Sequence, residues 1–298
     1  MTNIWAALYR EYVADEIDED STDELIFEVK EALYSYIARE LKESGEIKPP
    51  LLRSFDSPYI KGRGVNSVIL ASRIAVDACL VPKRGGFEIF IKESLPYFRQ
   101  RLCLAHELAH TYFYKFIEGR DYPVHVAKSA KKYMQVDWKL DEGFTYEIAR
   151  EILLPRFLIR KIKHKNIDLN MLFVLQRKFA APISLIAKRA IHDLKYLDSC
   201  FIIAEYEKGG VRTGTPKVIY KGESFKRISI RKLWRKAISK HLMNCNMIDL
   251  DPGEIVTFDM EDYNIVGETT KIGNKIFTNL EIGNGKKRKT NKTLLDFV

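Results

Sequence analysis

Hydrophobic residues recur every three or four positions along several stretches of the chain, and this spacing predicts amphipathic helices there. The longest stretch covers residues 21–47, where a serine or threonine can cap the first turn and KPPLL ends the helix. Further helices are predicted over residues 96–116, 141–154, 168–179, 183–197 and 228–243. Helices should therefore form much of the protein.

Alternating apolar and polar residues predict strands in two other parts of the chain. VIL, IAVDACLV and FEIFI lie within residues 68–91, and the turn sequence PKRGG separates the last two. SCFIIAEYE, PKVIYKG, EIVTFDM and NKIFTNLEI lie beyond residue 198. We predict an α+β fold in three parts: an acidic helical region at 1–50, a mostly helical core with a small sheet at 51–198, and an α+β domain at 199–298.

The composition favours a cytoplasmic protein. No run of about 18 apolar residues is present, so no contact with a membrane is expected. The first residues lack the basic and apolar regions of an export signal. The four cysteines are scattered without a CxxC pair, which is typical of reduced thiols rather than of a disulfide framework.

The charge is distributed unevenly along the chain. Residues 1–50 carry a net charge of −8, whereas residues 156–198 carry +7 and residues 212–240 carry +9. Basic stretches of this kind can contact DNA or an acidic partner. They can equally be lysine-rich helix faces exposed to solvent, and both interpretations stay open at this point.

The helix predicted over residues 96–116 contains the sequence HELAH. Residues four apart lie on the same face of a helix, so His106 and His110 can direct imidazole nitrogens at one cation. Glu107 would then lie beside the metal, where it could take a proton from a bound water. Unpaired imidazoles in an otherwise apolar run would cost free energy unless something binds them. The pattern therefore predicts a metal site, and its residue types favour Zn²⁺.

A catalytic zinc keeps three protein ligands and one position for water, so a third ligand has to come from elsewhere. The residues after HELAH read TYFYKF and hold no further histidine. Lone histidines at other positions are more often surface or capping residues than ligands; these are His125, His164, His192 and His241. A carboxylate on the next predicted helix, DEGFTYEIAREILLP, is the stronger candidate.

Together, RQRLCLAHELAH and DEGFTYEIAREILLP resemble the ImmA/IrrE family of bacterial and phage metallopeptidases. Members of that family carry a strand, then R-x-R-φ-x-φ-A-H-E-φ-x-H with φ apolar, and later E-x-x-A-x-x-F-A-x-x-L-L-M-P. FEIFI is the strand, and the residues that match the two patterns around HELAH are Arg99, Arg101, Leu102, Leu104, Ala105, Glu142, Ala149, Leu153 and Pro155. The second pattern departs at Thr145, Ile148, Ile152 and Leu154. The resemblance covers about residues 60–197.

The resemblance implies a zincin-like peptidase core in which His106, His110 and Glu142 bind Zn²⁺. It makes Glu107 the general base and acid for hydrolysis of a peptide bond. It also implies a helix-turn-helix-like segment after the core, here at residues 167–197.

Two details of this site are left open by the sequence. Because the second pattern is only partly matched, Glu147 and, behind it, Asp141 stay as alternative third ligands. A residue that stabilises the oxyanion is not assigned, and the possibilities are Tyr112, His125 and Tyr146.

Members of the family cleave helix-turn-helix repressors and thereby release genes for stress response or mobile-element transfer. The resemblance therefore implies a zinc-dependent endopeptidase with a cytoplasmic protein substrate such as a transcriptional repressor. Some relatives carry a small sensor-like α+β domain after the core, and the strand order predicted for residues 199–298 is compatible with one. The oligomeric state is not predicted.

Two other classes of function fit the same residues. The helix-turn-helix-like segment could read DNA while helix 228–243 adds phosphate contacts, which would make the protein a DNA-binding transcriptional regulator with a structural or vestigial zinc site. The second helix of that segment is mostly apolar, and its residues that could reach a groove are Lys188, Arg189, His192 and Lys195. A catalytically inactive zinc scaffold for protein interaction is the third class, and the intact Glu107 argues against it.

Overall fold

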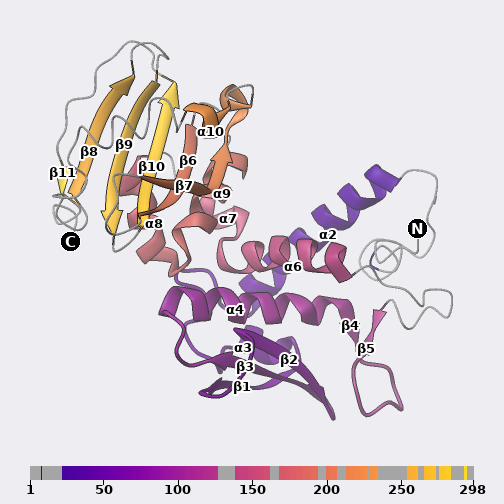
Figure 1. Cartoon of the computed structure of the whole chain (residues 1–298). Helices are drawn as coiled ribbons and strands as arrows, with labels where there is room; N and C mark the ends of the chain where they lie inside the picture. Colours follow the sequence, from indigo (N-terminus) through magenta and orange to yellow (C-terminus); the bar gives the residue numbers. More distant parts are fainter. Residues whose placement is uncertain are drawn as a thin grey trace. The chain divides into compact units, whose positions relative to one another are not determined.

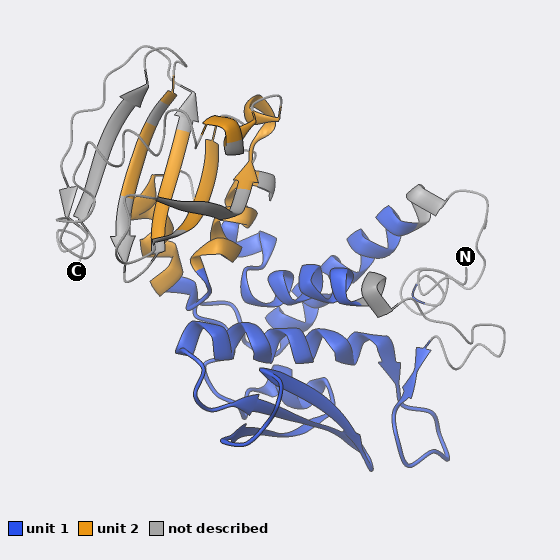
Figure 2. Cartoon of the chain, viewed as in Figure 1, with its two compact units in different colours: residues 1–161, 178–182 blue, residues 162–177, 183–298 orange. Residues whose placement is uncertain are grey.

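The computed structural model describes residues 8, 22–126, 138–161, 168–193, 199–206, 213–226, 229–233, 254–260, 265–272, 275–282 and 292–293. Helices and sheets both form large parts of the described chain, and the predicted α+β class is confirmed. The chain divides into two compact units (Figure 2). Unit 1 contains residues 1–161 and 178–182, and unit 2 contains residues 162–177 and 183–298.

Unit 1 is built in layers. Helix α4 (Tyr97–His110) lies between a three-stranded sheet and helix α6 (Trp138–Leu153), as Figure 1 shows. Helix α6 also packs against α2 (Thr22–Glu43), so the N-terminal helix belongs to the same unit, although its acidic composition predicts a separate region at 1–50. Apolar side chains of these helices are fully buried, among them Leu33, Ile37, Ala105, Leu108, Ile148 and Ile152.

The three-stranded sheet has the order β1 (Val65–Ala71), β3 (Gly86–Lys92) and β2 (Ala78–Lys83). Strand β1 runs parallel to β3 and β2 runs antiparallel to it, so β1 and β2 are edge strands within the described residues. Gly85 closes the β2–β3 hairpin at a φ of 72°, a left-handed conformation that glycine adopts without steric cost. The strands lie where the apolar patterns predict them, except that β2 covers only the second half of IAVDACLV.

Helix α4 ends at His110, earlier than the predicted end near residue 116. Residues 111–113 form a single 3₁₀ turn, η1, in which the Thr111 hydroxyl donates to the Leu108 carbonyl at 2.6 Å. Tyr114 is then extended, with φ −123° and ψ 151°. Because β-branched and aromatic side chains lose rotamer freedom in a helix, the sequence TYFY favours this early end.

Helix α6 begins three residues before its predicted start and ends at Leu153, before the predicted stop at Pro155. Beyond this end the backbone N–H of Arg156 donates to the buried Glu151 carboxylate at 2.8 Å. The shorter elements of unit 1 are α3 (Pro58–Gly62), η1 (Thr111–Phe113), β4 (Tyr114–Lys115), β5 (Val124–His125) and α7 (Arg156–Ile159).

Unit 2 holds a six-stranded sheet with the order β11-β8-β9-β10-β6-β7, in which all pairs are antiparallel. The strands are β6 (Ser199–Tyr206), β7 (Thr213–Lys221), β8 (Glu254–Met260), β9 (Ile265–Ile272), β10 (Lys275–Ile282) and β11 (Lys292–Thr293). The sequence patterns predict β6, β7, β8 and β10 but miss β9, since IVGETTKI combines a glycine with several polar residues. Strand β9 nevertheless pairs with both β8 and β10.

Helices α8 (Leu169–Phe179) and α9 (Ile183–Asp193) correspond to the predicted helix-turn-helix-like segment. Asp168 caps α8 by accepting the Met171 N–H at 2.7 Å, and Glu268 of β9 accepts the Leu169 N–H at 3.0 Å. Helix α9 contacts β6 and β7. These contacts place most of the segment in unit 2, so the unit boundary differs from the domain boundary predicted between residues 198 and 199.

After β7 come the 3₁₀ turn η2 (Glu223–Phe225) and helix α10 (Ile230–Leu233). The rest of the predicted helix 228–243 and most of the basic tail after residue 284 lie outside the described residues. In the described part of the chain no single helix is long and apolar enough to cross a membrane. Helices α8 and α9 are long and apolar enough only when they are taken together, and the pair is bent by 115°.

Candidate metal centre

The HELAH sequence occupies the last turns of α4. The apolar residues in and around it are buried against the rest of unit 1, namely Leu104, Ala105, Leu108 and Ala109. This packing fixes the rotation of the helix about its axis. His106 and His110 follow each other at one-turn spacing on α4, with ring centroids 4.8 Å apart.

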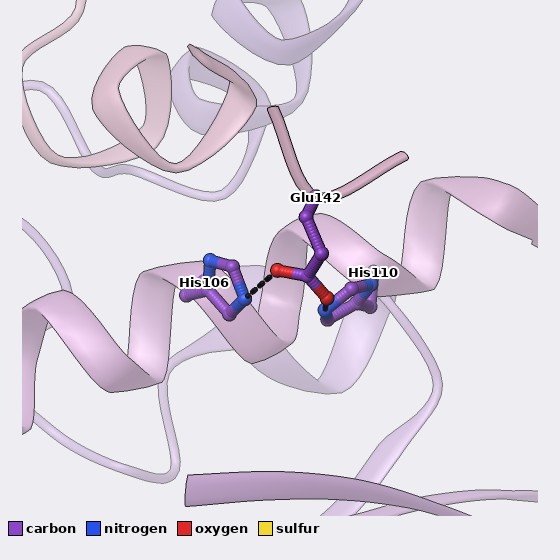
Figure 3. Close-up of side chains that lie close together, drawn as sticks. All are labelled: His106, His110 and Glu142. Carbon is purple, nitrogen blue, oxygen red and sulfur yellow. Dashed lines mark ion pairs between the residues drawn. The ribbon is translucent and has the colours of Figure 1, made fainter. Parts of the chain in front are cut away.

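Glu142, near the start of α6, brings its carboxylate to both histidines (Figure 3). Oε2 of Glu142 lies 3.1 Å from Nε2 of His106, and Oε1 lies 3.4 Å from Nε2 of His110. Each residue offers a ligand atom, and these atoms lie within 4.8 Å of one another, so the cluster could hold a metal ion. A donor set of two imidazoles and one carboxylate suits a divalent transition metal.

Burial keeps both imidazoles in the neutral form that binds metals. It lowers the pKa of His106 to about 4, and the charge of Arg99 acts in the same direction. Burial also lowers the pKa of His110 to about 4, assisted by His106 and opposed by Glu142. At neutral pH both rings are therefore uncharged, and their contacts with Glu142 join a carboxylate to neutral imidazoles.

Glu107 is only 7% exposed. Burial raises the pKa of this carboxyl to about 7, and the negative charge of Glu142 adds to the shift. The backbone N–H of Leu80 hydrogen-bonds to Glu107 and partly offsets the rise in pKa. A carboxyl group with a pKa near neutrality is suited to accept and return a proton at physiological pH.

Leu80 lies in the middle of β2, whose partner strand within the described residues is β3. Leu80 contributes to the pKa of Glu107, so strand β2 lies near the helix that carries HELAH. Helix α4 packs on both β2 and β3. The carboxyl of Glu107 thus lies between the histidine cluster and an edge strand.

The structure distinguishes the alternative third ligands. Glu147 contacts α2 instead of the histidines, because its Oε2 lies 2.9 Å from Nζ of Lys30 and accepts the Tyr34 hydroxyl at 2.9 Å. Burial of Glu147 opposes its ionisation, but these two partners outweigh burial and lower its pKa. The side chain of Asp141 lies outside the described residues. Of the glutamates considered, Glu142 lies beside both histidines.

The two arginines upstream of HELAH bind α4 to two other segments of unit 1. Arg99 makes two hydrogen bonds to Asp77, at 3.0 and 2.8 Å, just before β2. Arg101 is 4% exposed and donates to the backbone carbonyls of Leu51 and Leu52. Arg101 therefore ties the segment after α2 to α4, and Arg99 ties the start of β2 to the same helix.

The three residues considered for oxyanion stabilisation have different surroundings. Tyr112 is fully buried, and its hydroxyl is held between Tyr59 at 2.7 Å and Glu40 at 2.6 Å, so it is engaged inside unit 1. Tyr146 is 47% exposed, and its ring centroid lies 4.4 Å from that of His106. His125 stacks on the Phe113 ring at 6.1 Å.

His125 also acts electrostatically on the cluster, since its charge lowers the pKa of His110. Tyr146 and His125 therefore border the histidine cluster, whereas Tyr112 does not take part in it. The positions of His164 and His241 and the side chain of His192 lie outside the described residues.

A buried polar network beside the end of α4 has no signature in the sequence. Arg63 donates to Glu40 at 3.1 Å and to the hydroxyl and the carbonyl oxygen of Thr111, each at 3.1 Å. Its guanidinium also stacks on the Tyr112 ring, 3.8 Å from the centroid. Thr111 directly follows His110, so this network fixes the chain at the end of the helix that carries both histidines.

No family model matches the chain, and no curated protein matches it. Among solved structures, it is similar to one described as a Mycobacterium tuberculosis transcriptional regulator. The two share 12% sequence identity, and the match has a TM-score of 0.49 and covers 94% of this chain and 80% of the other. A likeness at this level assigns neither an activity nor a binding site to the chain.

Proposed function

We propose that the protein is a zinc-dependent endopeptidase with a zincin-like core, related to the ImmA/IrrE metallopeptidases. One observation carries this proposal: the buried Glu107 carboxyl, with its pKa raised to about 7, lies next to a cluster of His106, His110 and Glu142. A structural metal site needs no buried acid with a neutral pKa beside it, whereas hydrolysis does.

The donor set supports zinc as the metal. Two histidines and one glutamate leave room for a water ligand, which is the arrangement of catalytic rather than structural zinc sites. Bound there, zinc would supply a Lewis acid for the substrate carbonyl and lower the pKa of an attacking water. The three side chains already converge on one point, so little reorganisation is needed for binding.

Glu107 would carry the proton transfers. Its carboxylate takes a proton from the water that attacks the peptide carbonyl, and its carboxyl then gives that proton to the leaving amine. Burial raises the pKa of Glu107 above that of a free glutamate, which favours return of the proton as well as its uptake.

Strand β2 supports a peptide as the substrate. Its edge beside Glu107 can accept an extended chain by backbone hydrogen bonding, a common way of binding peptides without a strong demand on sequence. A peptide paired there would present its carbonyl groups close to the proton acceptor. Tyr146 and His125, which border the cluster, are the residues in reach to polarise the carbonyl oxygen.

The resemblance to ImmA/IrrE peptidases suggests a helix-turn-helix repressor as the protein substrate, with release of stress-response or mobile-element genes as the outcome. The basic stretches at 156–198 and 212–240 would then help the enzyme approach a repressor bound to DNA. Incubation of the purified protein with candidate helix-turn-helix repressors tests this. We expect cleavage by the wild type and none by Glu107→Gln, and cleavage that survives Glu107→Gln would contradict the mechanism.

A DNA-binding regulator is the second candidate function. The observation in its favour is the bend of 115° between α8 and α9, an angle typical of helix-turn-helix pairs. Against it, Arg189, one of the four residues expected to reach a groove, is 1% exposed. A duplex shift that weakens steeply with salt, measured with the Glu107→Gln protein so that proteolysis is absent, would support this candidate.

A further inference from the structure

Unit 1 contains a pocket of about 490 Å³ that lies apart from the histidine cluster. Residues of α2, of the end of α3 and of the segment after α4 line it, among them Tyr36, Arg39, Arg63, Thr111, Lys115 and Phe116. Its lining includes neither the two histidines nor Glu142. Its volume is in the range of pockets that hold small molecules.

The charges around the pocket are of one sign. Arg39, Arg63 and Lys115 line it, and no carboxylate does. Glu40 lies behind the lining and pairs with Arg63 at 3.1 Å, which offsets part of one positive charge. Within the described part of the chain, Arg39 forms no ion pair and stacks on the Tyr36 ring, 4.9 Å from its centroid. The pocket therefore has an excess of positive charge that favours an anion.

The two arginines of the pocket are held in position before any ligand arrives. Arg63 is fixed by hydrogen bonds to Glu40 and Thr111 and by the Tyr112 ring below it. Arg39 is oriented by the Tyr36 ring. Arg63 already donates from Nε, Nη1 and Nη2 to these partners, so Arg39 is the guanidinium whose planar fork can match the oxygens of a phosphate group.

Aromatic rings complete the wall of the pocket. Phe116 is 55% exposed, which is unusual for a phenylalanine side chain. Its ring is nevertheless fixed, since it packs edge-on against Phe87 at 5.9 Å and against Gly64, where an added Cβ would approach the ring to 2.7 Å. Tyr36 and Tyr114 also line the pocket. Such rings offer a flat apolar surface on which a planar group can stack.

We propose that this pocket binds the phosphate group of a small phosphorylated molecule and that its aromatic wall takes a planar ring, as a mononucleotide would provide. A phosphate group carries up to two negative charges and three terminal oxygens, so it can form more charge-assisted hydrogen bonds with Arg39 and its neighbours than a carboxylate can. The pocket adjoins Thr111, the residue after His110, so the ligand binds at the end of the helix that carries two of the three proposed zinc ligands. The site is independent of the proposed peptidase activity.

Calorimetric titration of the full-length protein in phosphate-free buffer tests the proposal. The probes are AMP, adenosine, inorganic phosphate and acetate, added separately. We expect saturable binding of AMP, weaker binding of inorganic phosphate, and none of adenosine or acetate. Arg39→Ala should weaken AMP binding about tenfold, since it removes one charge-assisted contact. Arg84→Ala removes an exposed guanidinium outside the pocket and should leave the affinity unchanged.

Gly62→Glu provides a second variant. Gly62 lines the pocket and a Cβ added there meets no atom within 4 Å, so the substitution adds a negative charge at the lining without a clash at the Cβ. It should abolish AMP binding, while circular dichroism and zinc content stay those of the wild type. The proposal is wrong if AMP fails to bind at millimolar concentration, if acetate binds as well as AMP, or if both pocket variants bind AMP as the wild type does.

Discussion

Nε2 of His106 lies 3.1 Å from Oε2 of Glu142, and the other oxygen of the same carboxylate lies 3.4 Å from Nε2 of His110. Glu147, five residues further along α6, faces away to Lys30 and Tyr34. Five residues correspond to a rotation of about 140° around a helix, so the two glutamates point in different directions. One helix thus supplies a metal-ligand candidate on one side and an anchor for α2 on the other.

The first prediction concerns these two glutamates. Glu142→Gln removes a charged ligand and should weaken zinc binding by at least about 100-fold, as should His106→Ala. Glu147→Gln is the matched control, because it makes the same chemical change on the same helix but faces Lys30. Metal analysis and competition with a chelator measure the effect. Loss of zinc in Glu147→Gln with full zinc in Glu142→Gln would reverse the assignment.

The sequence predicts the two histidines of the cluster from the spacing of ligands on one helix face and Glu107 from the HExxH pattern, whereas Glu142 is predicted from the resemblance to the ImmA/IrrE peptidases. It does not decide between Glu142 and Glu147, since that choice depends on how α6 is rotated between α4 and α2. The Arg63–Glu40 pair is also missed, because it joins residues of distant segments through tertiary packing.

Strand β9 is likewise a part of the fold that depends on tertiary contacts and that the sequence pattern does not predict. Its polar residues give it a weak strand signal, and its place in the sheet follows from pairing with β8 and β10. The end of α4 differs from the predicted one for a related reason. The aromatic residues after His110 continue the apolar pattern, while Thr111 bonds to Leu108 and Arg63 where the helix ends.

The second prediction separates the two tyrosines near HELAH. Tyr112→Phe removes the hydroxyl that donates to Glu40 and contacts Tyr59, so it should destabilise the protein by about 1–3 kcal/mol. Tyr146→Phe changes a half-exposed side chain and should alter stability by less than about 0.5 kcal/mol. Urea denaturation measures both. Equal stability of the two variants would contradict the buried network, and we expect zinc content to be unchanged in each.

The third prediction is a pH dependence of stability in metal-free protein. The pKa of Glu107 in the folded state, about 7, is above its value of 4.5 in an unfolded chain. Folding therefore favours the neutral carboxyl. The stability of the folded state is highest below pH 4.5 with respect to this group, and it falls as the pH rises through 7. Relative to the wild type, Glu107→Gln should gain up to about 3 kcal/mol of stability between pH 5 and pH 8.

Urea denaturation in the presence of a chelator at these two pH values measures this gain. Glu118→Gln is the control, because Glu118 is exposed and the same substitution there should give no difference between the two pH values. A gain of equal size in both variants would show that the effect does not come from the buried position of Glu107.

The last prediction compares the two arginines of RQRLCLAHELAH. Arg101 is buried and donates to the carbonyls of Leu51 and Leu52, so Arg101→Ala leaves both carbonyls without this donor and also creates a cavity. We expect a loss of about 2–4 kcal/mol in the free energy of unfolding. Arg99 pairs with Asp77 at the surface, where both side chains are nearly half exposed, and Arg99→Ala should cost less than about 1 kcal/mol. Urea denaturation of the two variants measures both losses. An equal loss would mean that the buried hydrogen bonds of Arg101 stabilise the protein no more than the surface ion pair of Arg99 does. Other contacts would then hold the segment after α2 to α4.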